Sequence, residues 1–215
     1  FVHSSEILEN YLRGLERNML AKRTFDLITS VIGLIVFSPI LLVTGLVILI
    51  TLGRPILYSP QRAGRSNTLI TVRKFRSMRI AEGPTSHHSG DDDPRVTTVG
   101  RWMRKFKIDE LPQLWNVMKG DMSIVGPRPE TPDYIKHYKP EQLIILELRP
   151  GITDFASIEF ADLGSLLEGD DPDKIYFEKV WDKKMDLRMK YVRERSFWVD
   201  IKLIFLTFTA VLRKK

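Results

Sequence analysis

Cysteine is absent from the 215 residues of this sequence, which excludes disulfide bonds, a thiol nucleophile and metal sites with cysteine ligands. The sequence also lacks an RNP-type pattern and a recognition-helix signature, so a nucleic-acid-binding function has no motif to support it. The longest apolar stretch exceeds the apolar core of a cleaved signal peptide, and no small-x-small cleavage site follows it. We therefore expect that stretch to remain in the mature protein.

Basic residues are in excess, with a net charge of +6 and a pI near 9.5. Such a charge favours anionic partners such as a phospholipid surface, nucleotides, sugar phosphates or nucleic acid. Hydrophobic residues make up 43% of the chain, but many of them lie in one uninterrupted block. The remainder is polar enough to predict one globular domain of modest size.

The uncharged block runs from Leu27 to Gly53. A straight helix of that length would measure roughly 40 Å, more than the ~30 Å hydrocarbon core of a bilayer. Pro39 has no N–H to donate to Ile35, and its ring clashes with that carbonyl group. The Ser38 hydroxyl can return to a carbonyl of the preceding turn and increase the bend. We therefore predict a break at Ser38-Pro39 into two halves that are each too short to cross a bilayer.

Both flanks of this block are basic, and basic flanks mark the cytoplasmic side of a membrane. The residues concerned are Arg13, Arg17, Lys22 and Arg23 before the block, and Arg54, Arg62, Arg65, Arg73 and Lys74 after it. A re-entrant element that enters and leaves on the same side satisfies both observations, and a kinked membrane span is the alternative. We expect Lys22 and Arg23 to bind lipid head groups in general, and specific binding of a polyprenyl phosphate is the alternative.

Hydrophobic periodicity and turn residues predict an α+β fold that is mainly helical, with a β-hairpin in a small globular domain. Besides the two halves of the membrane element, we expect an amphipathic helix at 1–21, helices at 98–107, 111–118, 134–148 and 175–195 (the last on the surface), and an interfacial helix at 197–212. We expect strands at 56–58 and 69–72, joined through a loop at 61–67, and a strand or loop at 152–160. The remaining segments are an exposed loop at 81–94 and an acidic loop at 162–173. The corresponding division of the chain is 1–21, 22–53, 54–195 and 196–215.

The strongest local signal for chemistry is the pair Asp109-Glu110, followed by Leu111-Pro112. Proline is common in the first turn of a helix, so Asp109 lies at or just before a helix N-terminus. An isolated Asp at this position is usually an N-cap. Here the neighbouring basic residues are Arg101, Arg104, Lys105, Lys107 and Arg128. Carboxylates among so many cations indicate an anionic substrate together with Mg²⁺, which binds one or two carboxylates and substrate phosphates.

Several motifs, taken in order along the chain, resemble the bacterial sugar transferases, the monotopic polyprenyl-phosphate phosphoglycosyl transferases. They are Lys22-Arg23-x-Phe25-Asp26, Ser38-Pro39, Lys74-Phe75-Arg76-Ser77-Met78, Asp109 to Val117, Lys119 to Ser123, Val125-Gly126-Pro127-Arg128-Pro129, Arg149 to Thr153 and Ser196 to Asp200. The resemblance extends from Lys22 to the end of the chain.

The resemblance implies transfer of a sugar 1-phosphate from a UDP-sugar to undecaprenyl phosphate, with release of UMP. Asp109 would form a covalent phosphosugar intermediate, and Glu110, with Asp109, would hold Mg²⁺. The implied substrate contacts are Lys74, Arg76, Arg104, Arg128 and Arg149. It further implies a re-entrant membrane helix broken at Ser38 and Pro39, contact with membrane lipids and a location at the cytosolic face of the bacterial inner membrane. Such a reaction is the first membrane step in making an O-antigen, a capsule, an exopolysaccharide or a protein-linked glycan.

Asp154 departs from the family, because many relatives carry glycine after the corresponding threonine, and this could mark a different sugar. The compact chain, without an extra membrane bundle, favours an N-acetylated sugar over a plain hexose. The oligomeric state stays open between a monomer and a homodimer. Two other functions compete with catalysis: a membrane-anchored scaffold in which Asp109 only caps a helix, and a basic nucleic-acid-binding protein.

Overall fold

The computed structural model of the protein describes residues 2–80, 90 and 92–213. These residues form a mostly helical body with three two-stranded sheets, so the predicted fold class holds in this coarse form. Most of the loop predicted at 81–94 lies outside the described residues.

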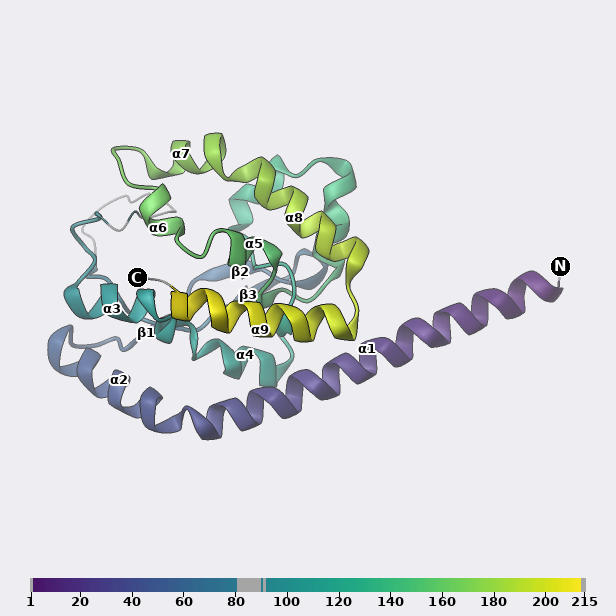
Figure 1. Ribbon diagram of the computed structural model, residues 1–215, viewed down its shortest axis with the longest axis horizontal. Coiled ribbons are helices and arrows are strands. Elements are labelled where there is room, and N and C mark those ends of the chain that lie inside the picture. The colour runs from purple at the N-terminus through teal and green to yellow at the C-terminus, as the bar shows by residue number, and fades with distance from the viewer. Residues whose placement is uncertain (1, 81–89, 91, 214–215) are drawn as a thin grey trace.

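The first element is one continuous helix, α1 (Val2–Val36), where the sequence predicted two. The sequence has no proline before Pro39, so the backbone hydrogen bonds continue across the predicted boundary at residues 21 and 22. In Figure 1 the beginning of α1 extends away from the rest of the molecule, while its end runs beneath the body toward α2. Gly33 allows α1 to approach α4 (Gln113–Lys119) closely, because a Cβ atom there would lie 3.1 Å from a methyl group of Leu114.

The predicted break lies between α1 and α2 (Ser38–Thr51), and the two helices are bent by 60°. The Ile35 carbonyl, which Pro39 cannot satisfy, instead accepts a hydrogen bond from the Ser38 hydroxyl at 2.7 Å. Within the described residues no single helix is long and apolar enough to cross a bilayer. The bent pair Met19–Val36 and Ser38–Thr51 could do so, judged by length and composition alone.

The outer side of this bent pair exposes many large apolar side chains. They include Leu27, Ile28, Val31, Ile32, Ile35, Val36, Ile40, Leu42, Val43, Leu46 and Ile50. Exposed apolar surface of this extent marks an interaction with a membrane or another protein.

Arg23 and its neighbours fasten α1 to the body of the protein. The Arg23 guanidinium donates to the carbonyls of Val117 and Met118 at the end of α4, at 2.6 and 2.7 Å. Lys22 forms an ion pair with Asp200 at 2.5 Å. Each of these two cations therefore has a partner within the protein, and their position at lipid head groups stays a prediction.

The predicted hairpin exists with a different pairing. Strand β2 (Gln61–Ala63) pairs with β3 (Leu69–Thr71), and β1 (Leu57–Tyr58) pairs with β4 (Lys74–Phe75). Gly64 donates to the Thr68 carbonyl at 2.7 Å and closes a tight turn around the 3₁₀ segment η1 (Arg65–Asn67). Because this turn is shorter than the predicted loop, residues 61–63 belong to the sheet. The third sheet joins β5 (Ser123–Val125) to β6 (Gly151–Thr153) in parallel.

Several predicted helices are divided or displaced. The helix predicted at 134–148 is two 3₁₀ segments, η3 (Pro132–His137) and η4 (Pro140–Glu147), because Pro140 interrupts it. The helix predicted at 175–195 is α7 (Pro172–Lys179) followed by α8 (Trp181–Glu194). The strand or loop predicted at 152–160 includes α5 (Phe155–Glu159), and the acidic loop includes α6 (Leu163–Leu166). Helices α3 (Thr98–Lys105) and α9 (Phe197–Arg213) lie where they were predicted.

The prediction that residues 175–195 lie on the surface is wrong for α8, which buries Trp181, Met185, Arg188 and Tyr191. The main core lies between α1, α4, α8, α9 and the parallel sheet. Its fully buried members are Val72, Leu114, Val117, Met122, Ile124, Val125, Tyr191 and Leu203. Figure 1 shows α9, in yellow, running across the molecule, where it packs against α5 and β5.

Candidate active site

The pair Asp109-Glu110 lies in a 3₁₀ turn, η2 (Ile108–Glu110), between α3 and α4. Lys107, with φ of 56°, reverses the chain before this turn. The N-cap of α4 is Pro112, and no side chain caps that helix. The interpretation of Asp109 as a helix N-cap is therefore wrong, and its carboxylate is available for another role.

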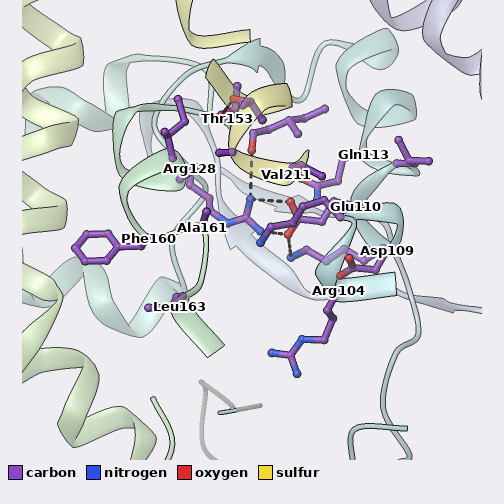
Figure 2. A pocket seen from close by; sticks show the side chains of 18 of the residues that line it. Arg104, Asp109, Glu110, Gln113, Arg128, Thr153, Phe160, Ala161, Leu163 and Val211 are labelled. Atoms are coloured by element: carbon purple, nitrogen blue, oxygen red, sulfur yellow. Dashed lines mark hydrogen bonds and ion pairs between the residues drawn. The ribbon is translucent and has the colours of Figure 1, made fainter. Parts of the chain in front are cut away.

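Glu110 is the centre of a buried ion cluster. Its carboxylate accepts from both terminal nitrogens of Arg128, with a distance of 3.0 Å from Nη1 to Oε2 (Figure 2). The Lys74 ammonium lies 3.2 Å from Oε1. Burial alone would raise the pKa of Glu110, but the charges of Arg128 and Lys74 hold it well below its ordinary value. Glu110 is therefore ionised at physiological pH.

Asp109 has a contrasting environment. Its side chain is 8% exposed, and its Oδ1 atom is buried without a hydrogen-bond partner among the described residues. Burial and the nearby charge of Glu110 raise the pKa of Asp109 to about 6. At pH 7 about nine-tenths of the carboxylate is still ionised. A buried, ionised oxygen without a donor is poorly solvated, which favours a nucleophile or a ligand for a cation.

Arg128 is held from several directions. Its side chain donates to the Ile152 carbonyl at 3.3 Å in addition to Glu110. Its backbone carbonyl accepts from Arg188 at 2.7 Å, and its backbone N–H donates to Asp154 at 3.2 Å. Prolines on both sides restrict the backbone further. The guanidinium is therefore fixed beside the two acidic residues.

A cavity of about 630 Å³ opens beside these charges. It extends from the ion cluster to the break between α1 and α2 and to the last turns of α9. The residues that line it at those two places are Thr29, Gly33, Phe37, Ile40, Ile204, Thr207, Phe208, Ala210 and Val211. One cavity thus connects the ion cluster around Glu110 with the apolar residues at the break between α1 and α2. Figure 2 shows Asp109, Glu110 and Arg128 grouped together, with Thr153 and Val211 nearby.

The charged lining of the cavity is mainly positive. The basic residues are Arg62, Lys74, Arg104, Lys107, Arg128 and Lys184, and the acidic ones are Asp109, Glu110 and Glu130. Six cations against three carboxylates leave an excess of three positive charges. An excess of one sign in a concave, partly buried site attracts a ligand of the opposite sign.

A family model described as bacterial sugar transferase matches residues 17–214. The chain belongs to the bacterial sugar transferase family. It is 38% identical over 200 residues to an undecaprenyl-phosphate glucose phosphotransferase of Komagataeibacter xylinus, covering 89% of this chain and 36% of that relative. It is 38% identical over 194 residues to the uncharacterized sugar transferase EpsL of Bacillus subtilis, covering 90% of this chain and 88% of that relative.

A third relative from Aeromonas hydrophila is named UDP-N-acetylgalactosamine-undecaprenyl-phosphate N-acetylgalactosaminephosphotransferase. The identity is 34% over 195 residues, and the match covers 89% of this chain and 43% of that relative. The chain therefore spans less than half the length of two of these three relatives and most of the length of the third.

In this sugar transferase the structure brings Lys74, Arg104 and Arg128 to the cavity together with the acidic pair. It does not bring Arg76 there. The buried Arg76 guanidinium donates to the carbonyls of Leu52, Gly53 and Arg54 at 2.5 to 3.2 Å, and so holds the end of α2. Arginine commonly binds such free carbonyls at helix C-termini.

Arg149 also lies outside the cavity lining. Burial and the like charges of Arg23 and Arg65 lower its pKa. The predicted group of substrate contacts is therefore divided, with three members at the cavity and two away from it.

Sequence reasoning missed Arg62 and Lys184 as cavity residues. Arg62 was assigned to a hairpin loop, and Lys184 to a surface helix. For Lys184 a signal was present, because Trp181, Lys184 and Arg188 follow the helical period that places residues on one face. For Arg62 the local sequence contains no comparable signal.

The two carboxylates supply only part of a donor set for a magnesium ion, and phosphate oxygens of a ligand would have to complete it. No group of three or more His, Cys, Asp or Glu residues able to hold a metal occurs in the part of the chain that the structure describes. Mg²⁺ needs only one or two carboxylates when phosphate oxygens supply further ligands. The unpartnered Oδ1 of Asp109, beside the Glu110 carboxylate, provides a donor set of this kind.

Proposed function

We propose that the protein transfers a sugar 1-phosphate from a UDP-sugar to undecaprenyl phosphate and releases UMP. Membership in the bacterial sugar transferase family and the names of the chain's relatives support this reaction class. The observation that carries the proposal is the single cavity that joins the buried Asp109 carboxylate to the α1–α2 break. A soluble, charged donor and an acceptor with a long apolar chain both need access to one reacting centre, and such a cavity offers it.

In the first step a carboxylate oxygen of Asp109 attacks the β-phosphorus of the donor. The bond between that phosphorus and the oxygen bridging to the α-phosphate breaks, and UMP leaves with the bond electrons. The product is a phosphosugar ester on Asp109. The raised pKa of Asp109 makes the carboxylate a better nucleophile than an ordinary one while leaving most of it ionised at neutral pH.

In the second step an oxygen of undecaprenyl phosphate attacks the same phosphorus and displaces the Asp109 carboxylate. The product is an undecaprenyl diphospho-sugar, and the free enzyme is restored. Arg128, Lys74 and Arg104 would bind the phosphate oxygens and reduce the repulsion between the anionic groups. Glu110 orients Arg128 and Lys74 through the ion pairs described above.

Glu110, with Asp109, would hold Mg²⁺, which when bound neutralises phosphate charge and polarises the phosphoryl group. Because Glu110 stays ionised, it can serve as a ligand over the whole physiological pH range.

The bent helix pair would enter one leaflet and return to the cytosolic face of the bacterial inner membrane. Its exposed apolar surface and the basic residues at both ends support this arrangement. Helix α9 would lie at the interface with membrane lipids, since Trp198, Phe205 and Leu212 are 76, 67 and 80% exposed. This geometry sets the depth of Asp109 near the head groups, where an undecaprenyl phosphate can reach it.

We propose that the sugar is N-acetylated, as in the name of the relative from Aeromonas hydrophila. The names of the relatives described above include glucose and N-acetylgalactosamine, so the test must cover both classes of sugar. The reaction would begin the membrane stage of an O-antigen, capsule, exopolysaccharide or protein-linked glycan.

The decisive experiment supplies the purified protein with Mg²⁺, undecaprenyl phosphate and a panel of UDP-sugars, and measures UMP release. We expect release with at least one sugar and loss of release in Asp109→Asn. Asp182→Asn is the matched control, because Asp182 is an exposed carboxylate of α8 outside the cavity lining. Full activity of Asp109→Asn would exclude the proposed nucleophile, and inactivity with every sugar would favour a scaffold function.

A separate experiment tests the covalent intermediate. The protein is incubated without acceptor and with a UDP-sugar labelled at the β-phosphate. We expect the label to remain on the protein, and peptide mapping to place it on Asp109. Label that stays on the donor while turnover proceeds with acceptor would indicate direct transfer instead.

A further inference from the structure

Arg62 differs from Lys74, Arg128 and Lys184, which also line the cavity. Lys74 and Arg128 share the Glu110 carboxylate, and Lys184 forms an ion pair with Glu130 at 3.1 Å. Arg62 has no carboxylate within ion-pair distance among the residues that the structure describes. Its side chain makes one hydrogen bond, to the neighbouring carbonyl of Gln61 at 2.9 Å.

The backbone holds Arg62 next to the loop that carries Arg128. Ala63 donates to the Glu130 carbonyl at 2.9 Å, which joins β2 to this loop. Within the hairpin Arg62 lies opposite Ile70, which fixes its register in the sheet. The backbone of Arg62 is therefore held at the cavity wall both by the hairpin and by the bond from Ala63 to Glu130.

The electrostatic environment of Arg62 is unfavourable to a lone cation. Burial lowers the pKa of Arg62, and the positive charge of Arg128 acts in the same direction. Glu130 offsets part of this effect, but its carboxylate is engaged by Lys184 and Arg188. An arginine stays charged in proteins even so, and within the described part of the chain four of its five N–H donors have no partner. These donors are available to an anionic ligand that enters the cavity.

We propose that Arg62 is a phosphate-binding residue of the cavity and holds a phosphate group of one of the two substrates. This inference rests on the proposed function and deepens it. A guanidinium donates two parallel hydrogen bonds to a phosphate, and few other side chains can do so. The phosphate belongs either to the diphosphate of the nucleotide-sugar donor or to the monoester of the lipid acceptor, and the two sources are separated by experiment.

Binding is measured in the Asp109→Asn background, so that turnover does not interfere. The probes are UMP, UDP and undecaprenyl phosphate in detergent micelles. We expect Arg62→Met to weaken binding of UMP and UDP, or of undecaprenyl phosphate, by roughly ten- to a hundredfold. Arg62→Lys retains the charge without the paired donors, and we expect a smaller loss.

Arg65→Met is the matched control. Arg65 belongs to the same hairpin, donates to the Glu147 carbonyl at 3.1 Å and lies outside the cavity lining. We expect this variant to bind all three probes as the parent does. Thermal unfolding of each variant checks that the hairpin is intact, and Arg62→Lys keeps the test valid if Arg62→Met does not fold.

The outcomes separate the possibilities. Weaker binding of UMP and UDP assigns Arg62 to the donor, and weaker binding of undecaprenyl phosphate alone assigns it to the acceptor. Unchanged binding of all three probes in both Arg62 variants overturns the inference and leaves the proposed function standing. Failure of the parent to bind any probe contradicts the proposed function itself, and this inference with it.

Discussion

The Asp154 carboxylate joins the backbone of Arg128 to the first turn of α5. Its Oδ2 accepts from the Arg128 N–H at 3.2 Å, and its Oδ1 accepts from the Ser157 N–H and hydroxyl at 2.6 and 2.7 Å. The side chain is completely buried. Asp154, the predicted departure from the family pattern, thus connects the arginine of the ion cluster with a helix that lines the cavity.

Replacing Asp154 should therefore affect both stability and catalysis. In Asp154→Ala we expect a loss of about 1–2 kcal/mol in the free energy of unfolding, since a helix cap and a buried acceptor are removed. We also expect a lower kcat, because Arg128 loses one of the contacts that position it. Asp154→Asn keeps a capping oxygen and should recover most of the stability. Denaturant unfolding and UMP release measure the two effects.

Asp171→Ala is the control for the cap alone, because Asp171 caps α7 by accepting from the Lys174 N–H at 3.0 Å on the surface. The Asp171→Ala variant should have a lower free energy of unfolding and an unchanged kcat. Equal kcat in the Asp154→Ala and parent enzymes would show that Asp154 has no influence on the site.

The pH dependence of the first half-reaction should report Asp109. With a pKa of about 6 the carboxylate is protonated below that pH, so the rate should fall about tenfold per pH unit there. The second ionisation of a phosphate monoester also lies near pH 6, so titration of the undecaprenyl phosphate acceptor would overlap with that of Asp109 in the pH profile. Single-turnover release of UMP without acceptor avoids this problem. A rate that stays constant down to pH 4.5 would contradict a carboxylate nucleophile with this pKa.

The same raised pKa predicts that Asp109 lowers stability at neutral pH. The folded protein binds the proton more tightly than the unfolded chain, so the contribution of Asp109 becomes less favourable as pH rises from about 4 through about 6. Asp109→Asn should therefore raise the free energy of unfolding at pH 7 by about 1–3 kcal/mol. Below pH 4 the difference should disappear. Unfolding in detergent at both pH values measures it, and a variant less stable than the parent at pH 7 would contradict the prediction.

Arg188 should be essential to the fold beneath Arg128. It is completely buried and donates to Glu130 at 2.8 Å, to Tyr138 at 2.9 Å and to the Arg128 carbonyl. Arg188→Met leaves Glu130 short of a charge partner, which should cost about 3–5 kcal/mol in the free energy of unfolding.

Arg193→Met is the control on the exposed end of α8, and it should change the free energy of unfolding by less than about 0.5 kcal/mol.

The charges of Lys184 and Arg188 lower the pKa of Glu130 to about 2, so the stability of the parent protein should also depend on pH. The stabilising effect of Glu130 is present above about pH 4.5 and should be lost as pH falls toward 2 in the parent protein. Unfolding curves of similar midpoint for the two arginine variants would contradict this role of Arg188.

The break at Ser38-Pro39 should control topology. In Pro39→Ala the Ile35 carbonyl regains a backbone donor, so we expect a straighter helix that can span the membrane. A cysteine placed at Ser4 should then become accessible to a membrane-impermeant reagent from the periplasmic side, whereas in the parent it should not. Ser38→Ala removes the hydroxyl and keeps the proline, and should leave the topology unchanged. Periplasmic labelling of the parent would exclude the re-entrant arrangement.

Features determined by a few neighbouring residues could be predicted from the sequence. Pro39 breaks the long apolar helix because its ring excludes one hydrogen bond, whatever surrounds it. Asp109 and Glu110 were found because they are adjacent and lie among basic residues, and family membership then followed from motifs that are each short and continuous.

Features that depend on residues far apart in the sequence were decided by the tertiary structure. Arg76 and Arg128 are both arginines beside turns, yet one holds the end of α2 and the other holds Glu110. The pKa values of Asp109 and Glu110 shift in opposite directions because the charges of Arg128 and Lys74, which are distant in the sequence, outweigh burial at Glu110 but not at Asp109. The sequence by itself determined the break, the acidic pair and the excess of positive charge. Only packing decided which cations face the cavity, because each guanidinium binds whichever acceptor the fold brings within reach.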